Sequence, residues 1–124
     1  MIRTIAIDDE PLALQLISGY IKKTPYLELV EAFENPLTAM EFLDDNDIDL
    51  IFLDIQMPDL TGTDFARMIN RVVKVVFTTA FEKYALEGFK LDVVDYLLKP
   101  FGYEDFLISA AKARKLIDLE NKAG

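Results

Sequence analysis

Apolar residues along the chain occur in two alternating arrangements, as short unbroken runs and as longer segments with helical spacing. The short runs are rich in β-branched residues and are bounded by polar or turn-forming residues, which is typical of strands. They predict five strands, over residues 2–7, 27–33, 50–53, 72–78 and 94–98.

The segments between these runs have apolar residues three and four positions apart, as in amphipathic helices. The first of these helices follows Asp9, a candidate N-cap, has Pro11 in its first turn and continues to about residue 21. Gly62 is expected to break the chain before the third helix. The other predicted helices cover residues 36–45, 64–70, 82–89 and 103–119.

Regular alternation of strands and helices predicts an α/β fold with a parallel sheet covered by helices on both faces. A chain this short fits a doubly wound sheet better than a barrel, and the expected strand order is the flavodoxin-like 2-1-3-4-5. In such sheets the ligand lies beyond the carboxyl ends of the strands, where the strand order reverses. This point lies between the first and third strands.

The composition supports one domain and excludes several kinds of chemistry. The chain has 124 residues, of which 52% are hydrophobic, so we expect one domain over residues 1–119 and a polar tail or linker start over 120–124. Absence of cysteine and histidine excludes thiolate and imidazole chemistry. The net charge of −9 argues against direct nucleic-acid binding. No apolar run is long enough to span a membrane, and the early first strand leaves no room for a signal peptide, so a cytoplasmic location is expected.

Three carboxylates follow the two strands that flank the expected ligand position. Asp8 and Asp9 come directly after the first strand, and Asp54 directly after the third. Taken singly, Asp9 could be an N-cap, Asp54 a turn residue and Asp8 a solvated loop acid. Together they would repel one another unless a cation lay between them. An oxygen-only set of this kind favours Mg²⁺ or Mn²⁺.

The last two strands lead to groups that suit a phosphoryl ligand. Thr79 ends the fourth strand with a hydroxyl, and Lys99 follows the fifth with an ammonium, before Pro100. Thr79 could also be only a strand or turn residue, and Lys99 only a solvated charge. With the acids, however, they supply what is needed to form and hold an aspartyl phosphate. The Lys99–Pro100 peptide could be cis, which would aim the lysine.

Four segments, IDDEP, FLDIQMPDLTG, FTTAF and DYLLKPF, occur in an order and spacing that resembles the receiver domain of bacterial two-component response regulators. The resemblance covers essentially the whole chain. It implies a phosphorylation-dependent switch, a sensor histidine kinase as partner and no enzymatic activity beyond the domain's own phosphoryl transfer and dephosphorylation. The segment over residues 85–101 looks most like receivers of regulators with LytTR-type DNA-binding output domains, although Gly88 and Asp92-Val93 stand where small residues such as Ala or Gly are more usual.

The resemblance also implies a role for each site residue. Asp54 would be the phosphoacceptor and would bind Mg²⁺ with Asp9 and the backbone carbonyl of Gln56, while Asp8 would act through water. Thr79 and Lys99 would bind phosphoryl oxygens. Tyr96 would turn inward on phosphorylation and, with Thr79, alter the face formed by residues 82–89, 94–98 and 103–119. This face, which includes Phe89, Tyr96 and Phe101, would contact a partner or a second copy. Alternatively, these aromatic residues could simply belong to the core.

Gln56 and Phe81 occupy the two positions that, in this family, control the access of water to the acyl phosphate. Phe81 has no polar group to orient water, so slow self-dephosphorylation is expected. Alternatively, Phe81 could turn away and pack against the helix over 82–89.

Two other functions fit parts of the pattern. An aspartate-nucleophile phosphatase of the haloacid dehalogenase type generally requires a second Asp two residues after the nucleophile, where this chain has Gln56. A flavodoxin-like binding module would need a loop rich in Thr, Ser and Gly after the first strand, whereas this chain has Asp8, Asp9 and Glu10 there, which would repel a cofactor phosphate.

Overall fold

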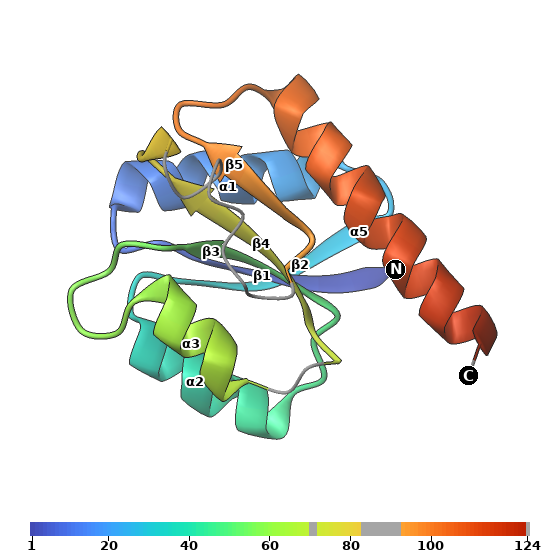
Figure 1. Cartoon of the computed structure of the whole chain (residues 1–124), viewed down its shortest axis with the longest axis horizontal. Helices are drawn as coiled ribbons and strands as arrows, with labels where there is room; N and C mark the ends of the chain where they lie inside the picture. The colour runs from blue at the N-terminus through green and yellow to red at the C-terminus, as the bar shows by residue number, and fades with distance from the viewer. Residues whose placement is uncertain (70–71, 83–92, 124) are drawn as a thin grey trace.

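The computed structural model describes residues 1–69, 72–82 and 93–123 (Figure 1). The predicted helix over 82–89, together with Gly88, Phe89 and Asp92, lies outside the described residues, except for Glu82. The strands are β1 (Ile2–Ile7), β2 (Leu27–Phe33), β3 (Leu50–Asp54), β4 (Lys74–Thr79) and β5 (Asp95–Leu98). The helices are α1 (Pro11–Lys23), α2 (Pro36–Asp45), α3 (Gly62–Met68) and α5 (Tyr103–Ala123).

The five strands form one parallel sheet in the order β2-β1-β3-β4-β5, which confirms the predicted topology. In Figure 1 the sheet lies between α1 and α5 on one face and α2 and α3 on the other. The order reverses at β1, which pairs with both β2 and β3. The carboxyl ends of β1 and β3 are therefore neighbours at the predicted ligand position.

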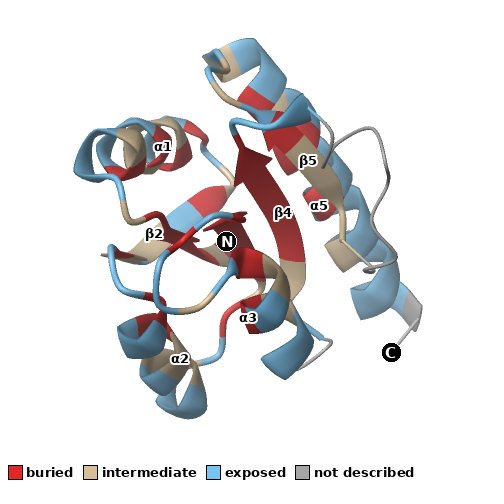
Figure 2. Ribbon diagram, turned by 60° about the vertical axis from the view of Figure 1, so that its left-hand side comes forward, coloured by how far each residue is buried: buried red, intermediate tan, exposed pale blue. Residues whose placement is uncertain are grey.

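Alternating side chains of the central strands build a separate hydrophobic layer on each face of the sheet. Leu50 and Phe52 of β3 pack with α1 and α5, whereas Ile51 and Leu53 pack with α2 and α3. Every residue of β3 is buried. The neighbouring strand β4 is also buried from Val75 to Thr79, as its red colour in Figure 2 shows. Burial on both faces explains why this strand is a continuous apolar run in the sequence and does not alternate with polar residues. No helix among the described residues is long and apolar enough to cross a membrane.

The start of α1 corrects one prediction. Pro11 opens the helix as expected, but the N-cap position belongs to Glu10, whose side chain makes no capping hydrogen bond. Asp9 therefore does not cap α1. Its Oδ1 atom is buried and belongs to a cluster with Asp8 and Asp54, so the carboxylate serves that cluster instead of the helix.

Two further helix boundaries differ from the predictions. Gly62 does not break the chain before α3 but is its first residue, and Thr61 caps the helix by accepting a hydrogen bond from the N–H of Asp64 at 3.2 Å. The last helix, α5, continues through Ala123, beyond the predicted end at residue 119. An ion pair between Glu120 and Lys74, the first residue of β4, fixes this last part of α5 to the sheet.

Candidate functional site

The site is built at the carboxyl ends of four strands, where the sheet register aligns its residues. Ile7 of β1 lies opposite Leu53 of β3, so the next residues, Asp8 and Asp54, are neighbours across the two strands. On the other side of β3, Asp54 is paired with Thr78 of β4. The backbone N–H of Lys99 donates to the carbonyl oxygen of Thr79 at 2.7 Å, which places Lys99 at the same edge.

The acids gather as the sequence predicted. One carboxylate oxygen each from Asp8, Asp9 and Asp54 lies within 4.8 Å of the others. Asp8 and Asp54 are only 3% exposed. Oδ1 of Asp9 is buried and has no hydrogen-bond partner among the described residues. A carboxylate oxygen can only accept when ionised, so this buried atom has an unused lone pair, and the cluster to which Asp9 belongs offers only oxygen ligands, which suits a hard divalent cation.

The predicted cation, Lys99, lies between two of these acids. Its Nζ is 2.8 Å from Oδ2 of Asp8 and 3.5 Å from Oδ1 of Asp54. Burial alone would lower the pKa of Lys99, but the hydrogen bond to Asp8 and the charges of Asp54, Asp8 and Glu10 together raise the pKa above its ordinary value. Lys99 therefore stays protonated in the site, and the Lys99–Pro100 peptide that follows is cis.

Asp54 is in an environment that disfavours its negative charge. Its pKa is raised from 3.8 to about 7, chiefly by burial, then by the charge of Asp8 and by a hydrogen bond with Asp9. The charge of Lys99 and a hydrogen bond from the backbone N–H of Gln56, 3.4 Å from Oδ1, oppose the rise. One lysine does not balance the charge of the buried acids, so additional positive charge at this edge would favour ionised Asp54.

The residues predicted to sense a phosphoryl group lie around this cluster. Thr79 is fully buried at the end of β4, and its Oγ1 accepts a hydrogen bond from the backbone N–H of Phe81 at 3.0 Å. Phe81 is 45% exposed, and Gln56 is exposed on the loop after β3. Gln56 and Phe81, the two residues predicted to control the access of water, thus flank the site from the loops after β3 and β4.

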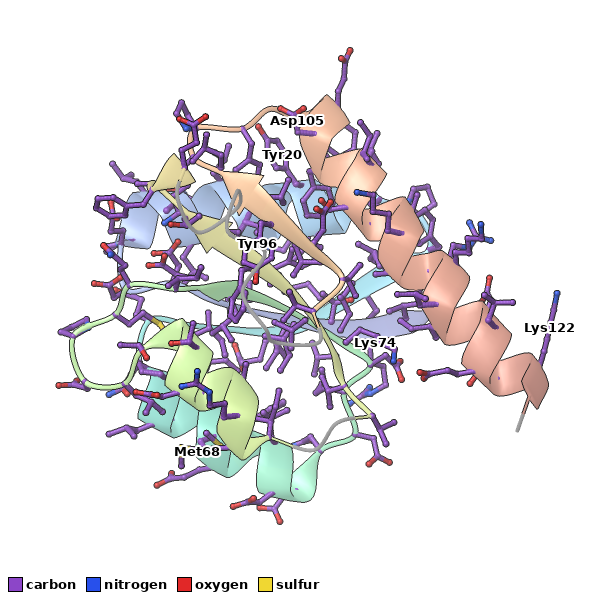
Figure 3. The ribbon with its side chains drawn as sticks, in the orientation of Figure 1. Tyr20, Met68, Lys74, Tyr96, Asp105 and Lys122 are labelled. Atoms are coloured by element: carbon purple, nitrogen blue, oxygen red, sulfur yellow. The ribbon has the colours of Figure 1, made fainter. Side chains whose placement is uncertain are left out.

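Tyr96 lies on β5 (Figure 3). Its ring packs against Phe77 of β4 at a centroid distance of 5.5 Å. Its hydroxyl is buried and has no hydrogen-bond partner among the described residues. Burial also raises the pKa of Tyr96. The ring thus already packs against β4 with its hydroxyl buried, so the inward turn on phosphorylation that the sequence suggested stays a prediction. An acceptor that reached this hydroxyl would stabilise the packed position.

Two residues near the site were not assigned to it from the sequence. Glu10 places Oε1 4.0 Å from Nζ of Lys99. Its position directly after Asp8 and Asp9 in the sequence is the feature that could have identified it as a site residue. Gly62 donates its N–H to the carbonyl oxygen of Ile55 at 2.7 Å, and a Cβ at Gly62 would lie 2.3 Å from the carbonyl oxygen of Asp54. The first turn of α3 therefore packs directly on the backbone of Asp54, a tertiary contact that no local sequence pattern shows.

Comparison with known proteins gives one family and a consistent set of relatives. The family model described as "Response regulator receiver domain" matches residues 4–111. The transcriptional regulatory protein YpdB of Escherichia coli K12 is 39% identical over 102 residues, which are 80% of this chain and 42% of YpdB. The sensory transduction protein LytT of Bacillus anthracis is 33% identical over 118 residues, 93% of this chain and 48% of LytT. The chain thus spans less than half the length of these curated relatives.

Solved structures show the same fold. The response regulatory domain of MrkE from Klebsiella pneumoniae superposes with a TM-score of 0.85 at 32% identity, covering 95% of this chain and 99% of that domain. The response regulator TrrA from Thermotoga maritima, solved in complex with Mg²⁺ and a beryllium fluoride, gives a TM-score of 0.76 at 27% identity over 91% of this chain and 99% of TrrA.

Proposed function

Since this chain belongs to the family of response regulator receiver domains of two-component signalling, we propose that Asp54 is the residue that accepts the phosphoryl group. One observation carries the proposal. The carboxylates of Asp8, Asp9 and Asp54 converge within 4.8 Å of one another, with the ammonium of Lys99 3.5 Å from Asp54. This arrangement positions a nucleophile and neutralises charge, which are the two requirements of phosphoryl transfer.

In the proposed reaction an oxygen of Asp54 attacks the phosphorus of the donor. An O–P bond forms on Asp54, the bond from phosphorus to the donor's leaving atom breaks, and that atom keeps the electron pair. Lys99, which donates to Asp8 at 2.8 Å before the reaction, shifts its ammonium to a phosphoryl oxygen. The hydroxyl of Thr79 accepts from Phe81, so its own proton can be donated to a second phosphoryl oxygen.

The proposed cofactor is Mg²⁺, with Mn²⁺ as an alternative. Asp9, Asp54 and the backbone carbonyl of Gln56 would hold the ion, and Asp8 would act through water. The oxygen-only donor set and the unpartnered Oδ1 of Asp9 fit such a cation. When bound, the ion neutralises charge that develops on the phosphoryl oxygens.

We further propose that a sensor histidine kinase donates the phosphoryl group. The proposed target of the switch is a DNA-binding output domain, as expected for relatives named transcriptional regulators. The receiver domain would occupy residues 1–119, with the following helical residues as its connection. Its only proposed chemistry is its own phosphorylation and dephosphorylation. The haloacid dehalogenase alternative is not favoured, because Gln56 offers an amide where that mechanism needs a general acid.

The test of this function is incubation of the whole chain with acetyl phosphate and Mg²⁺, followed by mass spectrometry of the intact protein and its peptides. The expected result is one added phosphoryl group on the peptide that contains Asp54. When Mg²⁺ is removed before the reaction, no phosphoryl group should be added. Turnover of phosphate esters without a stable adduct would favour a phosphatase. The absence of both an adduct and turnover would refute a phosphoacceptor site.

We expect phosphorylation to alter the face that contains β5 and α5. Pulling Thr79 toward a phosphoryl group moves the end of β4, and Tyr96, whose ring packs on Phe77 of the same strand, is expected to move in response. Beryllofluoride with Mg²⁺ should therefore shift the amide resonances of residues 93–105. It should also promote self-association through exposed apolar residues such as Leu98 and Ile108, measured by sedimentation velocity. Unchanged resonances of residues 93–105 at saturating beryllofluoride would contradict the switch.

Phe81 is expected to slow dephosphorylation. Its exposed aromatic side chain, beside the buried Thr79, can cover the acyl phosphate and offers no hydrogen bond to an attacking water. Phe81→Ala and Phe81→Glu should each accelerate phosphate loss, by about three- to tenfold for a barrier change of roughly 1 kcal/mol. The decay of the Asp54 adduct at fixed Mg²⁺ concentration measures the effect. Equal decay in all three proteins would leave Phe81 with a packing role only.

A further inference from the structure

A groove of about 410 Å³ lies where the C-terminal half of α5 passes the start of β2. Its apolar part consists of the ring of Tyr26 and the side chains of Ala111 and Leu119. Its cationic part consists of Arg114, Lys115 and Lys122, with Asp118 as the single acid. Arg114 stacks on Tyr26, 4.6 Å from the ring centroid, and lies 3.8 Å from Asp118.

The groove is bordered by further positive charge from the end of α1. Lys22 and Lys23 are the basic residues of its last turn, and Lys23 lies over the ring of Tyr103, 4.3 Å from the centroid. Tyr103 in turn hydrogen-bonds Thr24 at 3.1 Å, and Thr24 is only two residues before Tyr26 in the chain, so the end of α1 lies close to the groove. The end of α1 and the last half of α5 thus form one basic surface.

The lysines of this surface differ from the other cations of the domain. Lys74, Lys99 and Lys112 each pair with a carboxylate. Lys22, Lys23, Lys115 and Lys122 form no ion pair within the part of the chain that the structure describes, and Figure 3 shows Lys122 projecting from the last turn of α5. These lysines without an ion pair make this part of the surface positive, although the whole chain has a net charge of −9.

The chemistry of the groove discriminates between kinds of partner. A symmetric contact of this surface with itself in a second copy would place like charges together. Duplex nucleic acid would use the lysines, but its phosphates would gain little from the apolar surface of Leu119 and Ala111. A peptide with both acidic and apolar side chains would use the cations and the apolar surface together.

We propose that this groove binds an acidic segment of a partner protein, in which an apolar side chain flanked by Asp or Glu packs on Tyr26 and Leu119. The carboxylates of the segment pair with Lys115 and Lys122. Because α1 and α5 end where the strands begin, the groove lies at the edge of the sheet opposite Asp54. The contact is therefore separate from the phosphoryl site and does not depend on the function proposed for it.

The experiment is an NMR titration of the ¹⁵N-labelled chain with the peptide acetyl-Glu-Asp-Leu-Asp-Glu-amide at low salt. Saturable shifts are expected at the amides of Tyr26, Lys115 and Leu119, with a dissociation constant on the order of 1 mM. The double variant Lys115→Gln with Lys122→Gln should bind about fivefold more weakly. Lys112→Gln is the matched control, because Lys112 is on the same helix but pairs with Asp95 away from the groove.

Four results would overturn the proposal. A peptide with Gln in place of every acid that binds equally well would remove the role of charge. A short DNA duplex that shifts the same amides at lower concentration would assign the surface to nucleic acid. Shifts of these amides on dilution without peptide would assign the groove to a second copy of the chain. An absence of shifts with the acidic peptide would likewise refute an acidic occupant.

Discussion

Asp54→Asn is expected to abolish Mg²⁺-dependent phosphorylation by acetyl phosphate, with a loss of at least about a thousandfold in rate. The amide keeps the size of the side chain but is not a nucleophile, and it cannot form the acyl phosphate. The expected result in intact-mass spectrometry is an unmodified protein under conditions that fully modify the wild type. Asp59→Asn is the matched control, because Asp59 is an exposed acid on the loop after β3 and that variant should be phosphorylated normally.

The Asp54→Asn protein should remain folded, so loss of labelling will not reflect loss of structure. Without Mg²⁺, the raised pKa of Asp54, about 7, means that the folded wild type holds a proton that the unfolded chain, with a pKa of 3.8, has already released. The free energy of unfolding therefore falls as pH rises between these values, and the full cost is present above about pH 7. The neutral amide that replaces the carboxylate carries no such cost.

We therefore expect Asp54→Asn to be more stable than the wild type at about pH 8 by about 1–2 kcal/mol, a range reduced to allow for screening by water at the site. Near pH 4 the two should be similar. Urea unfolding at the two pH values measures the difference. Labelling of a folded Asp54→Asn protein at the wild-type rate would remove Asp54 from its proposed role.

Gly62→Ala is expected to destabilise the protein by about 1–3 kcal/mol. The new Cβ would lie 2.3 Å from the carbonyl oxygen of Asp54 and 2.8 Å from Cα of Ile55, and these backbone atoms cannot rotate away as a side chain could. Relief of the overlap requires α3 to separate from the end of β3, which also breaks the 2.7 Å hydrogen bond from Gly62 to Ile55. The measurement is the free energy of unfolding in urea.

Gly19→Ala is the control for Gly62→Ala. Gly19 lies within α1, and a Cβ there would meet no atom within 4 Å. Alanine should therefore stabilise that helix by up to about 1 kcal/mol, since it removes the cost of glycine in a helix interior. Equal unfolding free energies for wild type and Gly62→Ala would contradict the close contact between α3 and Asp54.

Features that depend on side-chain periodicity could be predicted from the sequence. The bounds predicted for β1, β2 and α2 agree with the structure, because their apolar and polar positions change sharply at each end. The convergence of Asp8, Asp9 and Asp54 also followed, since parallel strands bring their carboxyl ends to one edge. The strand order placed these residues together without any knowledge of their contacts.

Features that depend on contacts distant in sequence could not be predicted in the same way. Asp9 looked like an N-cap because its position relative to Pro11 is typical of one, whereas burial beside Asp54 decides its actual surroundings. Glu120, in the part of α5 beyond the predicted end, forms an ion pair with Lys74 on β4. Both cases involve tertiary contacts that a local sequence pattern does not reveal.

The strand β3 is buried on both faces and ends on Asp54, so the length of the strand determines where the carboxylate of Asp54 lies. Insertion or deletion of one residue in β3 would exchange the two sets of side chains that face opposite layers, and it would also turn Asp54 away from Asp8 and Lys99. Helix surfaces and loops can change in evolution without this double loss. The interval from Leu50 to Asp54 is therefore expected to tolerate substitution of its apolar residues by other apolar residues but no change in length.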